Sequence, residues 1–130
     1  MEDDAFSDEF CRFLRAAVPS VDAAELLLTL QREPDRWWSA LDAATALHPA
    51  TALTEAETMG YFAAFQTAAL LASAPDKRVQ FKPGNETLRG HVRTLEQAYR
   101  ERPVTLIRVI YALRDSRIQS FADAFKLRRR

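Results

Sequence analysis

Few side chains in this 130-residue sequence have the type and spacing that catalysis or metal binding requires. The two histidines, His48 and His91, lie far apart, and neither has a Cys, His or carboxylate at metal-ligand spacing. The only cysteine, Cys11, belongs to no recognisable motif and sits beside Phe10 and close to Phe13. We expect it to pack as a half-buried small hydrophobe. The sequence therefore predicts no metal, no cofactor and no redox site.

The acidic pairs have equally simple structural explanations. Asp3 and Asp4 lie in the N-terminal tail, and Glu55 and Glu57 fall in the first turn of a predicted helix. Helix capping and compensation of the helix dipole account for the second pair without acid–base chemistry. The sequence contains no glycine-rich phosphate loop and no nucleophile elbow, and it has only three glycines. We expect a protein that is not an enzyme.

The basic residues form a more suggestive pattern. Arg89, Arg93 and Arg100 follow one another at intervals of four and seven, so they share one face of a predicted helix over 86–102. Guanidinium groups bind phosphates or carboxylates bidentately, and an aromatic among basic residues can stack on an unpaired base. The predicted contact residues for a partner or a nucleic acid are Lys77, Arg78, Phe81, Lys82, Arg89, Arg93, Arg100 and Arg117.

Charge is distributed unevenly along the chain although its net value is zero. Residues 1–65 hold 4 basic and 12 acidic side chains, and residues 66–130 hold 14 basic and 6 acidic ones. An acidic and a basic half can pair within the chain, or they can dock a partner or a second copy through complementary potentials. Arginine outnumbers lysine by 15 to 3, which can equally reflect the base composition of the gene.

Composition indicates one folded helical domain. The hydrophobic fraction is 48%, and few glycines with frequent Ala and Leu favour helices over a turn-rich β fold. No apolar run approaches the ~20 residues of a membrane span, so we expect no membrane contact. The acidic start of the chain differs from the basic start of a signal peptide, and a lone cysteine fits a reducing compartment. We expect a cytoplasmic protein.

Capping residues mark where most helices should begin. Ser7, Ser20, Asp35, Thr54 and Asn85 each precede a segment with helical apolar spacing, and Thr54 forms a capping box with Glu57. The predicted helices cover 8–18, 21–33, 35–47, 54–73 and 86–102, then 104–113 and a last helix through Ile118, Phe121, Ala122 and Phe125. Gly60 lies inside one of them, and we expect it to allow close contact with a neighbouring helix.

Residues 104–113 are expected to form the centre of the fold. Eight of the ten are apolar, and a helix that is apolar on nearly all sides must be wrapped by other elements. Its β-branched residues also fit a strand, but the only strand-like partner is 78–81, and a two-stranded ribbon is marginal. Pro103 suits the first position of a helix. We therefore expect a helix.

The sequence as a whole predicts an all-α fold, a compact single-domain bundle of six or seven helices over residues 1–130. Residues 1–6 should be a frayed acidic terminus, 74–85 a long loop and 128–130 a basic tail. We expect a non-catalytic interaction or adaptor protein that docks a protein partner or itself. The alternative is a nucleic-acid backbone-binding subunit that uses the basic half. A helix-turn-helix over 104–127 is a third possibility.

Overall fold

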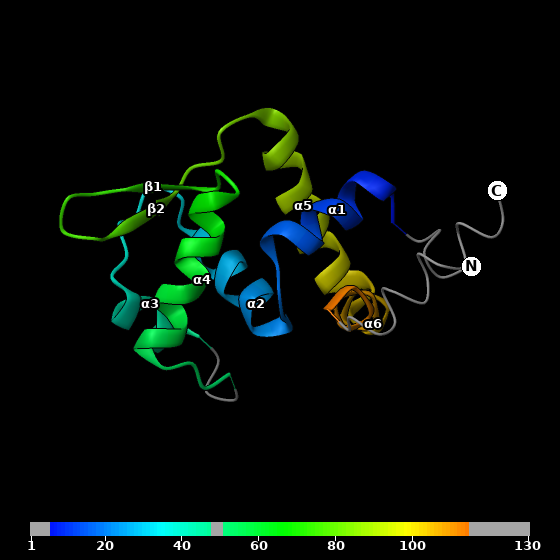
Figure 1. The fold of residues 1–130 in the computed structure, drawn as a ribbon, viewed down its shortest axis with the longest axis horizontal. Coiled ribbons are helices and arrows are strands. Elements are labelled where there is room, and N and C mark those ends of the chain that lie inside the picture. The colour runs from blue at the N-terminus through cyan, green and yellow to red at the C-terminus, as the bar shows by residue number, and fades with distance from the viewer. Residues whose placement is uncertain (1–5, 48–50, 115–130) are drawn as a thin grey trace, which may run out of the picture.

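The computed structural model describes residues 6–47 and 51–114 of the chain. Six helices and one small sheet occupy these residues, which confirms a mostly helical fold (Figure 1). In chain order they are α1 (Asp8–Ala17), α2 (Val21–Arg32), α3 (Ala40–Ala46), α4 (Glu55–Thr67), β1 (Leu71–Ser73), β2 (Val79–Phe81), α5 (Glu86–Glu101) and α6 (Pro103–Arg114). The predicted last helix, the basic tail and the second half of the predicted helix-turn-helix lie outside the described residues.

Four of the five predicted helix caps are present. The side chains of Ser7, Ser20, Thr54 and Asn85 each accept a hydrogen bond from a backbone N–H in the first turn of their helix. The Thr54–Glu57 capping box is complete, because the Glu57 carboxylate also accepts from the Thr54 N–H at 2.9 Å. These local bonds satisfy N–H groups that the helix itself leaves unpaired, so they fix where the helices begin.

The predicted start of the third helix at Asp35 is wrong. Ser39 caps this helix, and α3 begins at Ala40. Trp38 instead lies in extended backbone paired with Val79, with N–H to carbonyl distances of 2.7 and 2.9 Å in the two directions. The Trp38 side chain is fully buried, so its large apolar surface enters the core from an extended segment rather than from a helix.

The predicted long loop over 74–85 is also wrong, because part of it forms a β-hairpin. The preceding helix, α4, ends at Thr67 and not near Ser73, and Ala69 follows with φ of 63°. Strands β1 and β2 then pair antiparallel, with Leu71 opposite Phe81 and Ser73 opposite Val79. The turn between them contains Lys77 at φ of 72°. Pairing of Trp38 with Val79 adds a third, one-residue partner on the other edge of β2.

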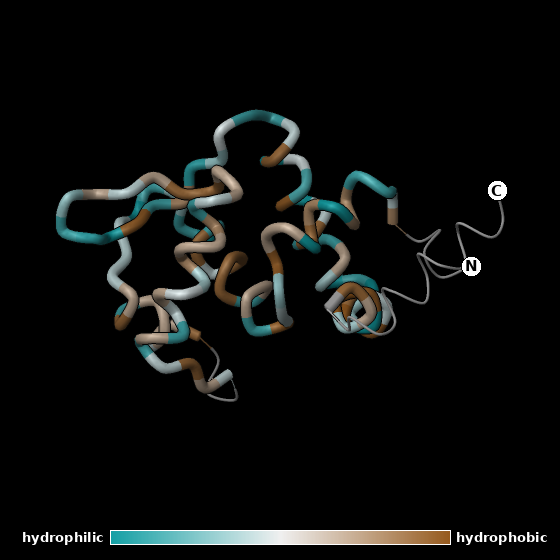
Figure 2. Tube along the Cα trace, viewed as in Figure 1, coloured by the Kyte–Doolittle hydropathy of each residue, from teal (hydrophilic) through white to brown (hydrophobic). Residues whose placement is uncertain are grey.

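The centre of the core is α2 and not the segment 104–113. Six of the twelve α2 residues are buried, namely Ala23, Ala24, Leu26, Leu27, Leu28 and Leu30. This helix packs against α3, α4, α5 and β2, and it lies in the middle of the molecule (Figures 1 and 2). The other segment is helical as predicted and contributes Leu106 and Ile110 to the core. Among the described elements it packs mainly against α1 and α5, at one end of the long axis.

The N-terminal residue of the described chain is part of the core. Phe6 is buried, and its ring lies 5.2 Å from that of Phe10. The Arg102 guanidinium lies over the Phe6 ring at 5.0 Å. The prediction of a frayed terminus over 1–6 is therefore wrong for Phe6, whose large apolar ring is buried, and residues 1–5 lie outside the described residues.

The central position of α2 can be tested by large-to-small substitution. Leu27→Ala should lower the free energy of unfolding by ~2–5 kcal/mol, because it leaves a cavity in a fully enclosed part of the core. Val104→Ala, in the apolar segment of α6, should change it by less than ~0.5 kcal/mol, because Val104 is 66% exposed. Urea unfolding measures both values. Equal losses would contradict the assignment of α2 as the core.

Candidate functional site

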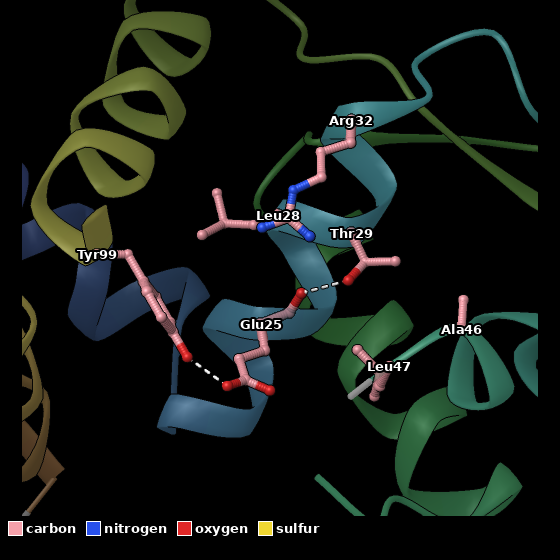
Figure 3. Close-up of a pocket in the computed structure, with 7 residues that line it drawn as sticks. All are labelled: Glu25, Leu28, Thr29, Arg32, Ala46, Leu47 and Tyr99. Carbon is pink, nitrogen blue, oxygen red and sulfur yellow. Dashed lines mark hydrogen bonds between the residues drawn. The ribbon is translucent and has the colours of Figure 1, made fainter. Parts of the chain in front are cut away.

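A cavity of about 290 Å³ lies between α2, the end of α3 and α5 (Figure 3). Its polar lining residues are Glu25, Thr29, Arg32 and Tyr99, and its apolar lining residues are Leu28, Ala46 and Leu47. The side chains at this site come from positions 25 to 99 of the sequence, so only the folded chain brings them together. Sequence reasoning missed this cavity, because none of its polar residues belongs to a motif.

The Glu25 carboxylate is the hydrogen-bonding centre of the cavity. Its two oxygens accept hydrogen bonds from two hydroxyl groups, one from Tyr99 and the other from Thr51. Figure 3 shows the Tyr99 ring reaching from α5 toward the Glu25 carboxylate on α2. These bonds join α2 to α5 and to the segment before α4, so this carboxylate holds three parts of the fold together.

The environment of Tyr99 keeps its hydroxyl protonated. Burial, followed by the hydrogen bond to Glu25, raises the pKa of Tyr99 from its ordinary value of 10.0 to about 12. A neutral phenol is a hydrogen-bond donor and not a base at neutral pH. Arg32 adds a positive charge at the cavity, where Figure 3 shows its side chain extending beside Leu28. In the cavity the Tyr99 hydroxyl donates to the Glu25 carboxylate, and the Thr29 hydroxyl donates to the Glu25 backbone carbonyl at 2.8 Å.

The hairpin residues of the predicted contact surface have different surroundings. Phe81 is buried, so its ring cannot stack on a base as predicted; it fills the core beneath β2. Arg78 is held by Asp76 through an ion pair of 2.7 Å, and hydrogen bonding to Arg78 lowers the pKa of Asp76. Lys77 and Lys82 are exposed.

The three predicted arginines of α5 are on the surface to different degrees. Arg93 and Arg100 are exposed, whereas Arg89 is partly buried and lies 3.5 Å from Glu86. The hairpin turn, which contains Lys77, lies at one end of the molecule, away from α5 (Figure 1), whereas Lys82 follows β2 and lies four residues before the start of α5 at Glu86. Arg117 lies outside the described residues.

Cys11 and His91, the described residues with side chains suited to metal or redox chemistry, pack among other side chains. Cys11 is half-buried, as predicted. His91 is partly buried, and its ring stacks on Phe13 with 5.1 Å between the ring centroids. His48 lies outside the described residues. Within residues 6–47 and 51–114, no cluster of three or more His, Cys, Asp or Glu side chains has metal-binding geometry.

Exposed large apolar side chains occur on α3 and α4 and on α6, two surfaces that sequence reasoning did not identify. The first, here called the acidic face, consists of exposed residues of α3 and α4: Leu41, Asp42, Glu55, Met59, Gly60 and Ala63. The second, here called the basic face, consists of exposed residues of α6: Val104, Arg108 and Tyr111. Leu41 is 57% exposed, Met59 47%, Val104 66% and Tyr111 62%. The apolar pattern of the sequence indicates these two surfaces, because α4 and α6 carry apolar residues on more sides than one contact with the core can cover.

Gly60 leaves open space beside the α4 backbone on the acidic face. A Cβ at this position would meet nothing within 4 Å, so the expected contact with a neighbouring helix is wrong for the described residues. Glycine in the middle of a helix costs ~0.5–1 kcal/mol relative to alanine. No contact in the described chain offsets this cost. Close approach of another chain to the α4 backbone would offset it.

The elements from α2 to β2 follow the order helix, short extended segment, two helices and hairpin, with the extended segment paired to the last strand. The helix pair α3–α4 therefore precedes the hairpin and lies elsewhere in the chain than the predicted helix-turn-helix over 104–127. In a helix-turn-helix that binds DNA, the second helix contacts the major groove. Here residues 40–67 contain Asp42, Glu55 and Glu57 but no Lys or Arg, so this helix pair lacks phosphate-binding side chains.

Comparison of the chain with protein-family models, curated proteins and solved structures finds no match in any of the three. No helix within the described residues is long and apolar enough to cross a membrane. The function of this protein is therefore inferred from its own surfaces.

Replacement of Tyr99 by Phe tests the role of the cavity. Tyr99→Phe should lower the free energy of unfolding by roughly 1 kcal/mol at neutral pH, because it removes one hydrogen bond to Glu25. The pKa of Tyr99 is higher in the folded than in the unfolded state, so its stabilising effect is complete below pH 10 and is lost as the pH rises to about 12. The gap between wild type and variant in urea unfolding should narrow over this range. A gap independent of pH would contradict the assigned environment.

Gly60→Ala should stabilise the isolated protein. The new methyl group has space, and the substitution reduces the entropy of the unfolded chain, so we expect a gain of ~0.5–1 kcal/mol. The measurement is the thermal midpoint in dilute solution. A lower midpoint would contradict the open space beside Gly60.

Proposed function

We propose that this protein is a non-catalytic interaction or adaptor module of the cytoplasm that docks protein surfaces through its acidic and basic faces. The observation that carries the proposal is the coincidence of exposed apolar side chains with one sign of charge on each face. Exposed large hydrophobic residues within one patch typically mark interaction sites when charged residues surround them.

The cavity supports a structural rather than a catalytic role. Both oxygens of Glu25 already accept hydrogen bonds from Tyr99 and Thr51. A general base must reach the proton of a substrate, and a carboxylate engaged by two hydroxyl groups of its own chain is poorly placed for that task. The single cysteine agrees with a reducing compartment.

Nucleic-acid binding is the second candidate, and the exposed arginines of α5 favour it. Arg93 and Arg100 share one helix face and can contact phosphates, with Arg89 beside them. Against this candidate, the hairpin contributes no exposed aromatic ring, and the helix pair α3–α4 is acidic. We therefore rank docking of a protein first.

A mobility-shift titration separates the two candidates. With single-stranded RNA, single-stranded DNA and duplex DNA at two salt concentrations, we expect no salt-sensitive shift for the wild type. Micromolar binding that weakens steeply with salt and disappears in Arg89→Glu/Arg93→Glu/Arg100→Glu would overturn the ranking. The triple variant should keep its thermal midpoint close to that of wild type, because Arg93 and Arg100 are exposed.

Protein capture tests the first candidate directly. A tagged wild-type chain should retain a protein partner after nuclease treatment, and a substitution on either face should reduce the amount retained. Capture that requires intact nucleic acid, or that neither face affects, would contradict protein docking through these faces.

A further inference from the structure

We propose that the partner of each face is the other face of a second copy of this chain, so that copies associate head to tail. This inference rests on the proposed function and names the occupant of both faces.

The two faces carry opposite charge. Residues 40–67, which contain α3 and α4, hold three acidic side chains and no Lys or Arg. Residues 103–114, which form α6, hold Arg108 and Arg114 and no acidic side chain. Opposite potentials steer association and fix orientation, whereas two acidic or two basic faces repel each other. Each face therefore fits the other better than it fits itself.

The two faces also hold most of the exposed apolar surface from large side chains. The large hydrophobic residues that are exposed within the described chain are Trp37, Leu41, Met59, Val104 and Tyr111. Leu41 and Met59 belong to the acidic face, Trp37 lies just before α3, and Val104 and Tyr111 belong to the basic face. Tyr111 is the type of residue that anchors interfaces, and the open backbone at Gly60 can accept a bulky side chain. Contact between the faces would cover four of the five residues.

The positions of the faces determine the kind of assembly. Helices α3 and α4 lie at one end of the long axis and α6 at the other (Figure 1). A contact between different faces is heterologous, so it gives rings if the rotation closes and open chains if it does not. Rings and open chains require the same contact, and the measured mass distinguishes them.

Paired variants test the contact by complementation. Met59→Lys adds a positive charge to the acidic face, and Tyr111→Glu adds a negative charge to the basic face. Each variant keeps the other face intact. Light scattering coupled to size-exclusion chromatography should give a wild-type mass above the 14.8 kDa monomer that rises with protein concentration and falls with added salt. Each variant alone should be monomeric, and an equimolar mixture should form a 1:1 dimer of about twice the monomer mass.

Matched controls place the same charges elsewhere. Ala16→Lys on α1 and Thr87→Glu on α5 lie at exposed positions outside both faces, and they should keep the wild-type mass. Thermal midpoints confirm that each variant is folded. If Met59→Lys or Tyr111→Glu fails to fold, Leu41→Ser and Val104→Glu replace them, because both positions are more than half exposed.

Three results on the wild type and the face variants would overturn the inference. They are a monomeric wild type at all concentrations, a face variant that keeps the wild-type mass, and a mixture that stays monomeric. Loss of association in both controls would also overturn it, because the effect would then not depend on the faces. A monomeric wild type that still captures another protein after nuclease treatment refutes self-docking alone. Absence of both self-association and protein capture refutes the proposed function as well.

Discussion

The fold depends on the burial of α2. Its Ala and Leu residues face α3, α4, α5 and β2, so most of the other elements gain their stability by covering this one helix. Hydrophobic burial is roughly proportional to the apolar area removed from water, and half of the α2 residues are buried. The Glu25 hydrogen bonds add orientation to this packing, because they tie α2 to Tyr99 of α5 and to Thr51 before α4.

The same arrangement explains why apolar residues remain at the surface. Helices α4 and α6 carry more apolar side chains than one contact with the core can cover, and each uses one side for the fold. In α6, Leu106 and Ile110 face the core, while Val104 and Tyr111 face outward. In α4, Phe62 and Phe65 are buried, while Met59 and Gly60 are exposed. These uncovered sides, together with their local charge, define the two faces on which the proposed function rests.

The sequence predicts most local features correctly, with the helix start at Asp35 as an exception, but it does not predict the long-range pairings. Capping residues such as Ser20 and Thr54 act within one helical turn, so their sequence neighbours reveal them. Trp38 was assigned to a helix because nothing near it in the sequence indicates its pairing with Val79, which is 41 positions away. Phe81 was placed on the surface for the same reason, since β1 and Trp38 flank its strand only after folding.

The candidate site likewise combines a feature that the sequence predicts with features that depend on folding. The basic pattern on α5 could be recognised from spacing along one helix, and the structure places Arg93 and Arg100 on the surface. The Glu25 cavity and the two faces depend on which side of each helix the core covers. That choice follows from tertiary packing, so an apolar segment such as 104–113 could be recognised as a helix but not placed in the fold.

Hydrogen–deuterium exchange of the wild-type protein at low and high concentration tests the central claim most directly, because it asks whether the uncovered sides of α4 and α6 become covered. We predict slower exchange at high concentration in residues 55–67 and 103–114, with no change in α2, which is already buried in the single chain. Exchange that is identical at both concentrations in α4 and α6 would contradict docking of one copy on another.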